Sequence, residues 1–195
     1  TAMRYLLFSN PHKDPELSAL ASCMPEAVYP AFQDAVTAHG LLSSDDFSLL
    51  LAARLLTETK ESLSSYLDLS PDLANRILRQ RHACSSFSEF ALQLTTKEMT
   101  YTRISRCLLH ILLNMTKEEF ETCKSEDYIS YARVLGFRKN ATPLLTEIKK
   151  NSSIPLVTSL ADARQTLSPE SLRILDLDIL RNQIYLGNLA LKNQT

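Results

Sequence analysis

Signals that begin a helix recur along this chain, and they constrain its fold more than any other feature of the sequence. Ser70 precedes Pro71 and an apolar stripe at helical spacing, and Thr116 precedes Glu119 by three positions. A serine or threonine at such a place accepts hydrogen bonds from free amides of the first turn, so both patterns are typical of helix N-termini. Further helix starts are predicted at Ser44, at Thr100 or Thr102, and at Ser168. The chain is therefore expected to be mainly α.

Two short segments instead have the composition of β-strands. Residues 128–137, YISYARVLGF, are rich in β-branched and aromatic residues as far as a glycine. Residues 153–160, SIPLVTSL, are a second candidate, in which Pro155 favours an edge position. The helical pattern between them completes a strand–helix–strand unit. We expect an α+β arrangement: a helical domain, this small unit, and a long C-terminal helix that begins at Ser168.

Glycine and proline indicate what the chain excludes and how it is divided. Its three glycines, Gly40, Gly136 and Gly187, are far apart. P-loops and dinucleotide-binding loops need clustered glycines to bring backbone amides to a phosphate, so the sequence excludes those classes of nucleotide enzyme. Four prolines break the first 40 residues into short helices. This predicts a connector over residues 1–40 and a helical domain over residues 41–195.

The cysteines and the apolar runs bear on location and on metal binding. The four cysteines form no CxxC pair and resemble no disulfide framework, which favours reduced thiols in a cytoplasmic protein. Cys107 and His110 stand three positions apart, as in some metal sites, but no second pair completes a four-ligand shell, so no metal is predicted. The apolar runs are too short for a membrane span, so no membrane association is expected. The sequence does not define an oligomeric state.

The net charge of −1 conceals an uneven distribution along the chain. Residues 76–151 carry 13 lysines and arginines against 8 acidic residues, whereas residues 1–75 carry 4 against 10. A basic middle segment indicates an anionic partner. The alternative is an ordinary solvated surface, and composition alone favours this alternative.

The clearest basic pattern lies on the helix expected over residues 100–115. Arg103 and Arg106 fall on the face opposite its apolar residues, so both are predicted to be exposed. Guanidinium groups match phosphate oxygens in paired hydrogen bonds, which favours a phosphate-binding stripe. His110 falls on the same face and is expected to be an exposed residue, with phosphate donation as the alternative.

Further cations and aromatic residues lie in the neighbouring segments. Aromatic rings among cations can stack on unpaired bases. Tyr101 and Tyr131 are candidates for this role, whereas Phe137 is expected to pack in a core. The residues predicted to bind RNA are Arg76, Arg79, Lys97, Tyr101, Arg103, Arg106, Arg133, Arg138 and Lys139.

These segments carry a family resemblance. Residues 74–114, from ANRILRQ to LLHILLN, and residues 131–150, YARVLGFRKNATPLLTEIKK, resemble the C-terminal half of bacterial tRNA(Met) cytidine acetate ligases. These ligases belong to the HIGH-type nucleotidyltransferase superfamily. The shared pattern is a lysine, T-x-x-R-I-x-R ahead of an apolar helix, and then Y-x-R-V-L-G-F. This chain differs at Glu98 and Met99, where the family usually has a basic residue and an aromatic one.

The resemblance implies an ATP-dependent reaction. ATP and acetate, with Mg²⁺, would form acetyl-adenylate, and the acetyl group would pass to the wobble cytidine of elongator tRNA(Met), giving N4-acetylcytidine. Residues 1–7, TAMRYLL, are similar to the end of the superfamily signature S-x-T-x-I-R, so Thr1 and Arg4 match positions that bind ATP phosphates.

No H-x-G-H motif is present in the sequence. The resemblance therefore implies a helical tRNA-binding part joined to the tail of a nucleotide-binding domain, which alone is inactive and binds no cofactor. Two other interpretations stay open. One is a complete small enzyme with a histidine and a carboxylate in a deep pocket. The other is a helical protein-interaction or scaffold domain, which an exposed apolar patch on the C-terminal helix would favour.

Overall fold

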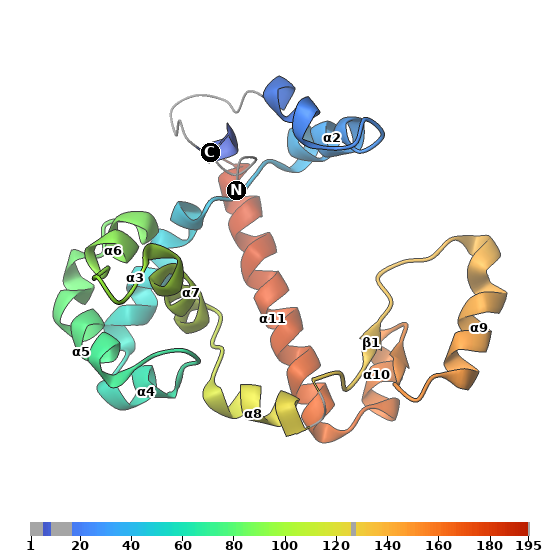
Figure 1. The fold of residues 1–195 in the computed structure, drawn as a ribbon. Coiled ribbons are helices and arrows are strands. Elements are labelled where there is room, and N and C mark those ends of the chain that lie inside the picture. Colours follow the sequence, from blue (N-terminus) through green and yellow to red (C-terminus); the bar gives the residue numbers. More distant parts are fainter. Residues whose placement is uncertain (1–5, 9–16, 126–127, 195) are drawn as a thin grey trace.

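The computed structural model describes residues 6–8, 17–125 and 128–194. Over these residues the fold is mainly α with one small parallel sheet, as predicted (Figure 1). With η denoting a 3-10 helix, the elements are η1 (Leu17–Cys23), α2 (Tyr29–His39), η2 (Ser44–Phe47), α3 (Ser48–Thr57), α4 (Lys60–Ser65), α5 (Pro71–Gln80), η3 (Arg81–Ala83), α6 (Phe87–Gln93), α7 (Tyr101–Leu112), α8 (Lys117–Ser125), β1 (Ala132–Arg133), η4 (Lys139–Ala141), α9 (Thr142–Asn151), β2 (Leu156–Val157), α10 (Leu160–Thr166) and α11 (Pro169–Lys192).

Local hydrogen bonds begin most helices where the sequence predicts. Four predicted caps are confirmed, at Ser70, Thr100, Thr116 and Ser168. In each, the side-chain oxygen accepts a hydrogen bond from the amide three residues further on, at 3.3, 3.4, 3.1 and 3.1 Å respectively. The predicted cap at Ser44 is wrong. Ser43 takes this role, because the Asp46 carboxylate reaches back and accepts a hydrogen bond from the Ser43 amide (2.5 Å).

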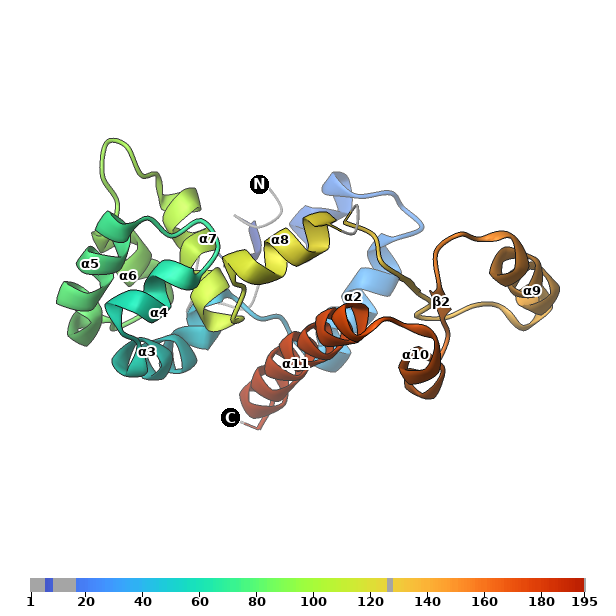
Figure 2. The same cartoon turned by 90° about the horizontal axis from the view of Figure 1, so that it is seen from below.

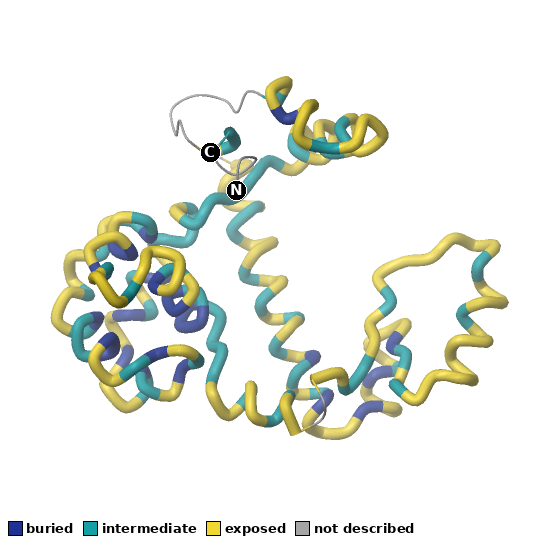
Figure 3. Tube along the Cα trace, in the orientation of Figure 1, coloured by how far each residue is buried: buried dark blue, intermediate teal, exposed yellow. Residues whose placement is uncertain are grey.

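The main hydrophobic core lies within the helical group α3–α7 (Figure 3). Leu51 and Leu55 of α3, Phe87 and Phe90 of α6, and Ile104 of α7 are all fully buried there. Within each helix these residues are three or four positions apart, which places them on one face. This core fixes the orientation of α7 and hence of the arginines on its outer face.

The predicted strand–helix–strand unit is present, with shorter strands than expected. β1 and β2 pair in parallel, with Ala132 opposite Leu156 and α9 between them in sequence. Only two residues of each segment form the ladder, Ala132–Arg133 in β1 and Leu156–Val157 in β2. The second hydrophobic core lies beside this sheet and consists of Val157, Ala163, Leu167 and Leu175 with half-buried neighbours.

Helix α11 runs between the helical group and the β1–α9–β2 unit, as two views at right angles show (Figures 1 and 2). Polar contacts tie it to the helical group. Arg181 donates to the Leu113 carbonyl (3.1 Å) and pairs with Glu119 (2.7 Å). Near its end, Lys192 pairs with Asp46 at 2.9 Å. Of the helices in the described part of the chain, none is both long and apolar enough to cross a membrane.

Candidate nucleic-acid interface

Helix α7 exposes Arg103 as the sequence predicts. Its opposite face packs Ile104, Leu108 and Ile111 into the main core, so Arg103 is directed outward near the first turn. The first turn of a helix has free amides and a partial positive charge, which favour an anion. Arg103 therefore adds a formal charge where the backbone already favours a negative ligand.

Arg106, one turn further along α7, has a partner within the protein. Its Nε lies 2.9 Å from the Asp68 carboxylate, in the loop between α4 and α5. Asp68 has a left-handed backbone conformation, with φ of 63°. Both side chains are partly exposed. Arg106 is exposed as predicted, but its ion pair with Asp68 connects α7 to the loop between α4 and α5.

The expectation that His110 is exposed is wrong. Only 7% of the residue is exposed, and its Nδ1 lies 2.9 Å from the Leu67 carbonyl. Since a carbonyl only accepts, Nδ1 carries the hydrogen of this bond. The loop between α4 and α5 folds over this part of α7, which a helical projection of α7 alone does not reveal.

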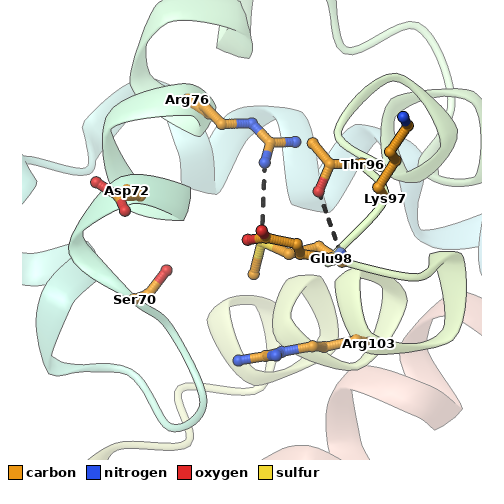
Figure 4. A pocket seen from close by; sticks show the side chains of 8 residues that line it. Ser70, Asp72, Arg76, Thr96, Lys97, Glu98 and Arg103 are labelled. Atoms are coloured by element: carbon orange, nitrogen blue, oxygen red, sulfur yellow. Dashed lines mark hydrogen bonds between the residues drawn. The ribbon is translucent and has the colours of Figure 1, made fainter.

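A hollow of about 500 Å³ opens between α5, the N-terminus of α7 and the turn Thr96–Met99 (Figure 4). The residues that line this α5–α7 hollow are Ser70, Asp72, Arg76, Thr96, Lys97, Glu98, Met99 and Arg103. Arg76 and Arg103 reach into it from α5 and α7, Glu98 extends toward the same space, and Lys97 points away (Figure 4). The structure thus brings together three of the predicted RNA-binding residues.

The turn that forms one wall of the hollow is closed by its own hydrogen bonds. The Met99 amide donates to the Thr96 carbonyl (3.3 Å) and side chain (3.1 Å), and the Thr96 amide donates to the Met99 carbonyl (3.0 Å). Lys97 and Glu98 lie between these two residues and are exposed. The turn therefore presents one positive and one negative side chain at the rim of the hollow.

The cations around the hollow have no acidic partner within the described part of the chain. Arg76 donates only to the sulfur of Met99, at 3.7 Å, and neither Lys97 nor Arg103 forms an ion pair there. Arg79, one turn beyond Arg76, is exposed and donates only to the Asn75 carbonyl in its own helix (3.3 Å). A bound phosphate would therefore gain hydrogen bonds without breaking an internal ion pair.

Arg81, which follows α5, has a structural role. Arg81 donates to the carbonyls of Leu55 (3.4 Å) and Glu58 (2.9 Å), where α3 ends.

Cys107 is buried in α7, and burial, followed by the Asp68 carboxylate, raises the pKa of its thiol. A thiol with a raised pKa stays protonated near neutral pH and is a poor nucleophile or metal ligand. No group of three or more His, Cys, Asp or Glu side chains able to hold a metal occurs among the described residues.

Three further predicted residues, Arg133, Arg138 and Lys139, lie in the β1–α9–β2 unit, on the other side of α11 (Figures 1 and 2). Arg133 pairs with Asp178 of α11 at 3.0 Å, so it holds the strand to that helix. Arg138 and Lys139 are exposed ahead of α9. The structure therefore divides the predicted interface into two regions, one on each side of α11.

Two aromatic predictions have different outcomes. Tyr101, in the first turn of α7, is 41% exposed. The expectation that Phe137 packs in a core is wrong, because Phe137 is 54% exposed and lies beyond the short strand β1. Its position directly before two cations was the signal that could have identified it. Thr1 and Arg4 lie outside the described residues.

Comparisons with known proteins agree with this architecture. The fold is similar to that of the crystal structure of Thermotoga maritima TmcAL bound with alpha-thio ATP, with a TM-score of 0.80 and 20% identity over 94% of this chain and 45% of that one. An apo crystal form of the same protein gives a TM-score of 0.73 over 83% of this chain and 40% of that one. The model of the HIGH Nucleotidyl Transferase family matches residues 1–195, so the chain belongs to this family.

The chain is also similar to proteins named tRNA(Met) cytidine acetate ligase. The tRNA(Met) cytidine acetate ligase of Acetivibrio thermocellus is 32% identical over 167 residues, 85% of this chain and 40% of that protein. The enzyme of the same name from Bacillus anthracis (strain CDC 684) is 30% identical over 159 residues, 81% of this chain and 40% of that protein. The chain thus spans about 40% of the length of these relatives.

Proposed function

We propose that this chain is the tRNA-binding, C-terminal part of a tRNA(Met) cytidine acetate ligase, and that the α5–α7 hollow receives a backbone phosphate of the tRNA. The observation that supports this most is the set of unpaired cations at the N-terminus of α7. Phosphate contacts from arginine and lysine, together with helix N-termini, position a protein on a nucleic acid. Since the relatives are tRNA(Met) cytidine acetate ligases, elongator tRNA(Met) is the RNA we assign to this surface.

The chemistry of acetylation belongs, in this proposal, to the whole ligase. ATP and acetate are its substrates, Mg²⁺ accompanies the ATP, and the acetyl group goes to the wobble cytidine. Residues 1–40 connect the nucleotide-binding part to the helical domain over residues 41–195. The described residues contribute the RNA surface and hold the tRNA while the reaction takes place elsewhere in the protein.

The test is a titration of this chain with elongator tRNA(Met) and with an unrelated tRNA at several salt concentrations. Affinity should fall steeply with salt, because each neutralised phosphate releases counterions. Arg103→Ala should weaken binding about tenfold, the effect of losing charge-assisted hydrogen bonds, and should reduce the salt dependence by about one phosphate. Arg173→Ala is the matched control, because Arg173 is also exposed but already pairs with Glu118 (3.3 Å). Equal effects of the two substitutions would contradict the assignment of the hollow.

A protein-interaction domain is the second candidate function, and one observation favours it. Helix α11 exposes four large apolar residues from its midpoint onward: Leu180, Tyr185, Leu186 and Leu191. Such a surface can serve a protein partner as well as solvent. If no tRNA binds at low salt, while Leu180→Gln with Leu191→Gln abolishes association with another protein, this second function replaces the first.

A further inference from the structure

The loop between β1 and η4 combines exposed apolar side chains with exposed cations. We call residues 135–139, LGFRK, the 135–139 loop. Leu135 is 87% exposed and Phe137 is 54% exposed, although both are large apolar residues. Gly136 between them is open, since apart from its two chain neighbours no residue has an atom within 4 Å of the place that a Cβ would take. More than half of each apolar residue therefore faces solvent.

Charge pairing separates this loop from the rest of its unit. Residues 128–151 contain five cations and one acid. Arg133 pairs with Asp178 at 3.0 Å, Lys149 lies 3.9 Å from Asp162, and Lys150 pairs with Glu147 at 3.2 Å. The other two cations, Arg138 and Lys139, have no acidic partner in residues 6–8, 17–125 and 128–194. Both directly follow Phe137, so the unpaired charge of the unit lies beside its exposed aromatic ring.

We infer that Phe137 is a stacking platform for an unpaired base of the bound tRNA, with Arg138 and Lys139 contacting the phosphates beside that base. This rests on the proposed function and adds a second contact, across α11 from the α5–α7 hollow. Surfaces that bind single-stranded nucleic acid combine aromatic rings for the bases with cations for the backbone, and every base has a face that can stack. The same combination explains why Phe137 is exposed while the residues around it carry uncompensated positive charge.

Unpaired RNA fits this surface better than duplex RNA does. Stacking requires a base that is free to leave its neighbours, as in a loop, a bulge or an end. Duplex RNA would offer phosphates to Arg138 and Lys139 but no base face to Phe137. The proposal therefore predicts discrimination between single-stranded and duplex forms of one oligonucleotide at this site.

The chain contains no tryptophan, which permits a direct measurement. Phe137→Trp creates the only indole in the protein, and base stacking on it should quench its fluorescence when elongator tRNA(Met) or a single-stranded oligonucleotide is added. Tyr185→Trp is the matched control, because Tyr185 is also an exposed aromatic residue, at 45%, but lies on α11. Its fluorescence should stay unchanged. An anionic polymer without bases should leave both indoles unquenched.

Affinity provides the second measurement. Phe137→Ala should weaken tRNA binding by a factor of about five to a hundred, the usual effect of losing one stacked base. Phe137→Leu, which keeps an apolar side chain, should weaken binding to nearly the same extent. Phe137 lies outside both cores, so these variants should keep the unfolding midpoint of the parent chain.

The outcomes separate the two proposals. Binding of tRNA without quenching of Phe137→Trp overturns the stacking platform and leaves the phosphate-binding hollow in place. Absence of tRNA binding by the parent chain overturns both. A fluorescence change with anionic lipid vesicles but none with RNA would assign the 135–139 loop to a membrane surface and overturn the inference.

Discussion

The helical group α3–α7 and the β1–α9–β2 unit both expose arginine and lysine side chains, but the hydrophobic cores beneath these cations differ greatly in size. In the helical group, apolar residues are inside and the arginines of α5 and α7 project from helices held by a large core. In the unit, the core is small and α9 itself buries no residue, while Leu135, Phe137 and Leu144 stay exposed. Regions with few buried contacts open at low free-energy cost. The comparison indicates one rigid and one adaptable basic surface.

The largest effect should come from the core of the helical group. Phe90 is fully buried in α6. Phe90→Ala should lower the free energy of unfolding by about 3–5 kcal/mol, because it removes apolar contacts and leaves a cavity. Leu144→Ala on α9, where Leu144 is 61% exposed, should change it by less than about 0.5 kcal/mol. Chemical denaturation measures both values, and similar losses would remove the contrast between the regions.

The next effect concerns Arg181, which ties α11 to α8 and to the end of α7. Arg181 and Glu119 are largely buried, at 18% and 10% side-chain exposure. Arg181→Ala should cost about 3 kcal/mol, because it leaves the Glu119 carboxylate buried without its partner. Arg173→Ala is the control on the same helix: its pair with Glu118 is exposed, so the cost should be below about 1 kcal/mol. Denaturation with a separate probe in each region would show whether the two regions then unfold apart. Equal costs would contradict the burial of the Arg181 pair.

A smaller effect should arise at the rim of the α5–α7 hollow. Glu98 extends toward the space between Arg76 and Arg103 (Figure 4). Its carboxylate opposes a phosphate there, so Glu98→Gln should strengthen tRNA binding about two- to fivefold, most clearly at low salt. Glu121→Gln on α8, an exposed acid away from the hollow, should leave the affinity unchanged. Weaker binding by Glu98→Gln would mean that this carboxylate contacts a donor group of the RNA.

The smallest effect concerns pH. Burial alone would raise the pKa of Asp46, but hydrogen bonds from Lys192 and Ser43 place it below its ordinary value of 3.8. A carboxyl with a lowered pKa in the folded state stabilises the fold above its unfolded pKa, and this contribution disappears as the pH falls through the folded value. Acid titration of the unfolding free energy below pH 3.8 should therefore be steeper for the parent chain than for Asp46→Asn. Parallel curves would show that the contact between α11 and η2 does not contribute.

Local signals made much of the fold predictable. Ser70, Thr100 and Ser168 cap their helices because a cap depends on the sequence within one turn. The outward direction of Arg103 and Arg106 follows from the helical period alone. The strand–helix–strand unit was identified from composition, although its strands proved shorter, because strand length depends on a partner far along the chain.

Contacts between distant segments could not be predicted in this way. Arg106 and Arg133 looked like free cations, but Asp68 and Asp178, 38 and 45 positions away, pair with them. His110 is buried by a loop 43 positions away, at Leu67. Phe137 was expected inside because aromatic residues usually are, and only the structure shows how little core its unit has.

Helix α11 has a consequence for the kind of ligand that the protein can select. The helix lies between the α5–α7 hollow and the 135–139 loop, and polar contacts hold it to both neighbouring regions. If both surfaces contact one RNA, the distance between them sets the shortest RNA that can bind both at once. A short oligonucleotide would reach one surface at a time, and only a molecule long enough to bridge them would gain from simultaneous binding. Selection by length and shape would then precede any reading of sequence.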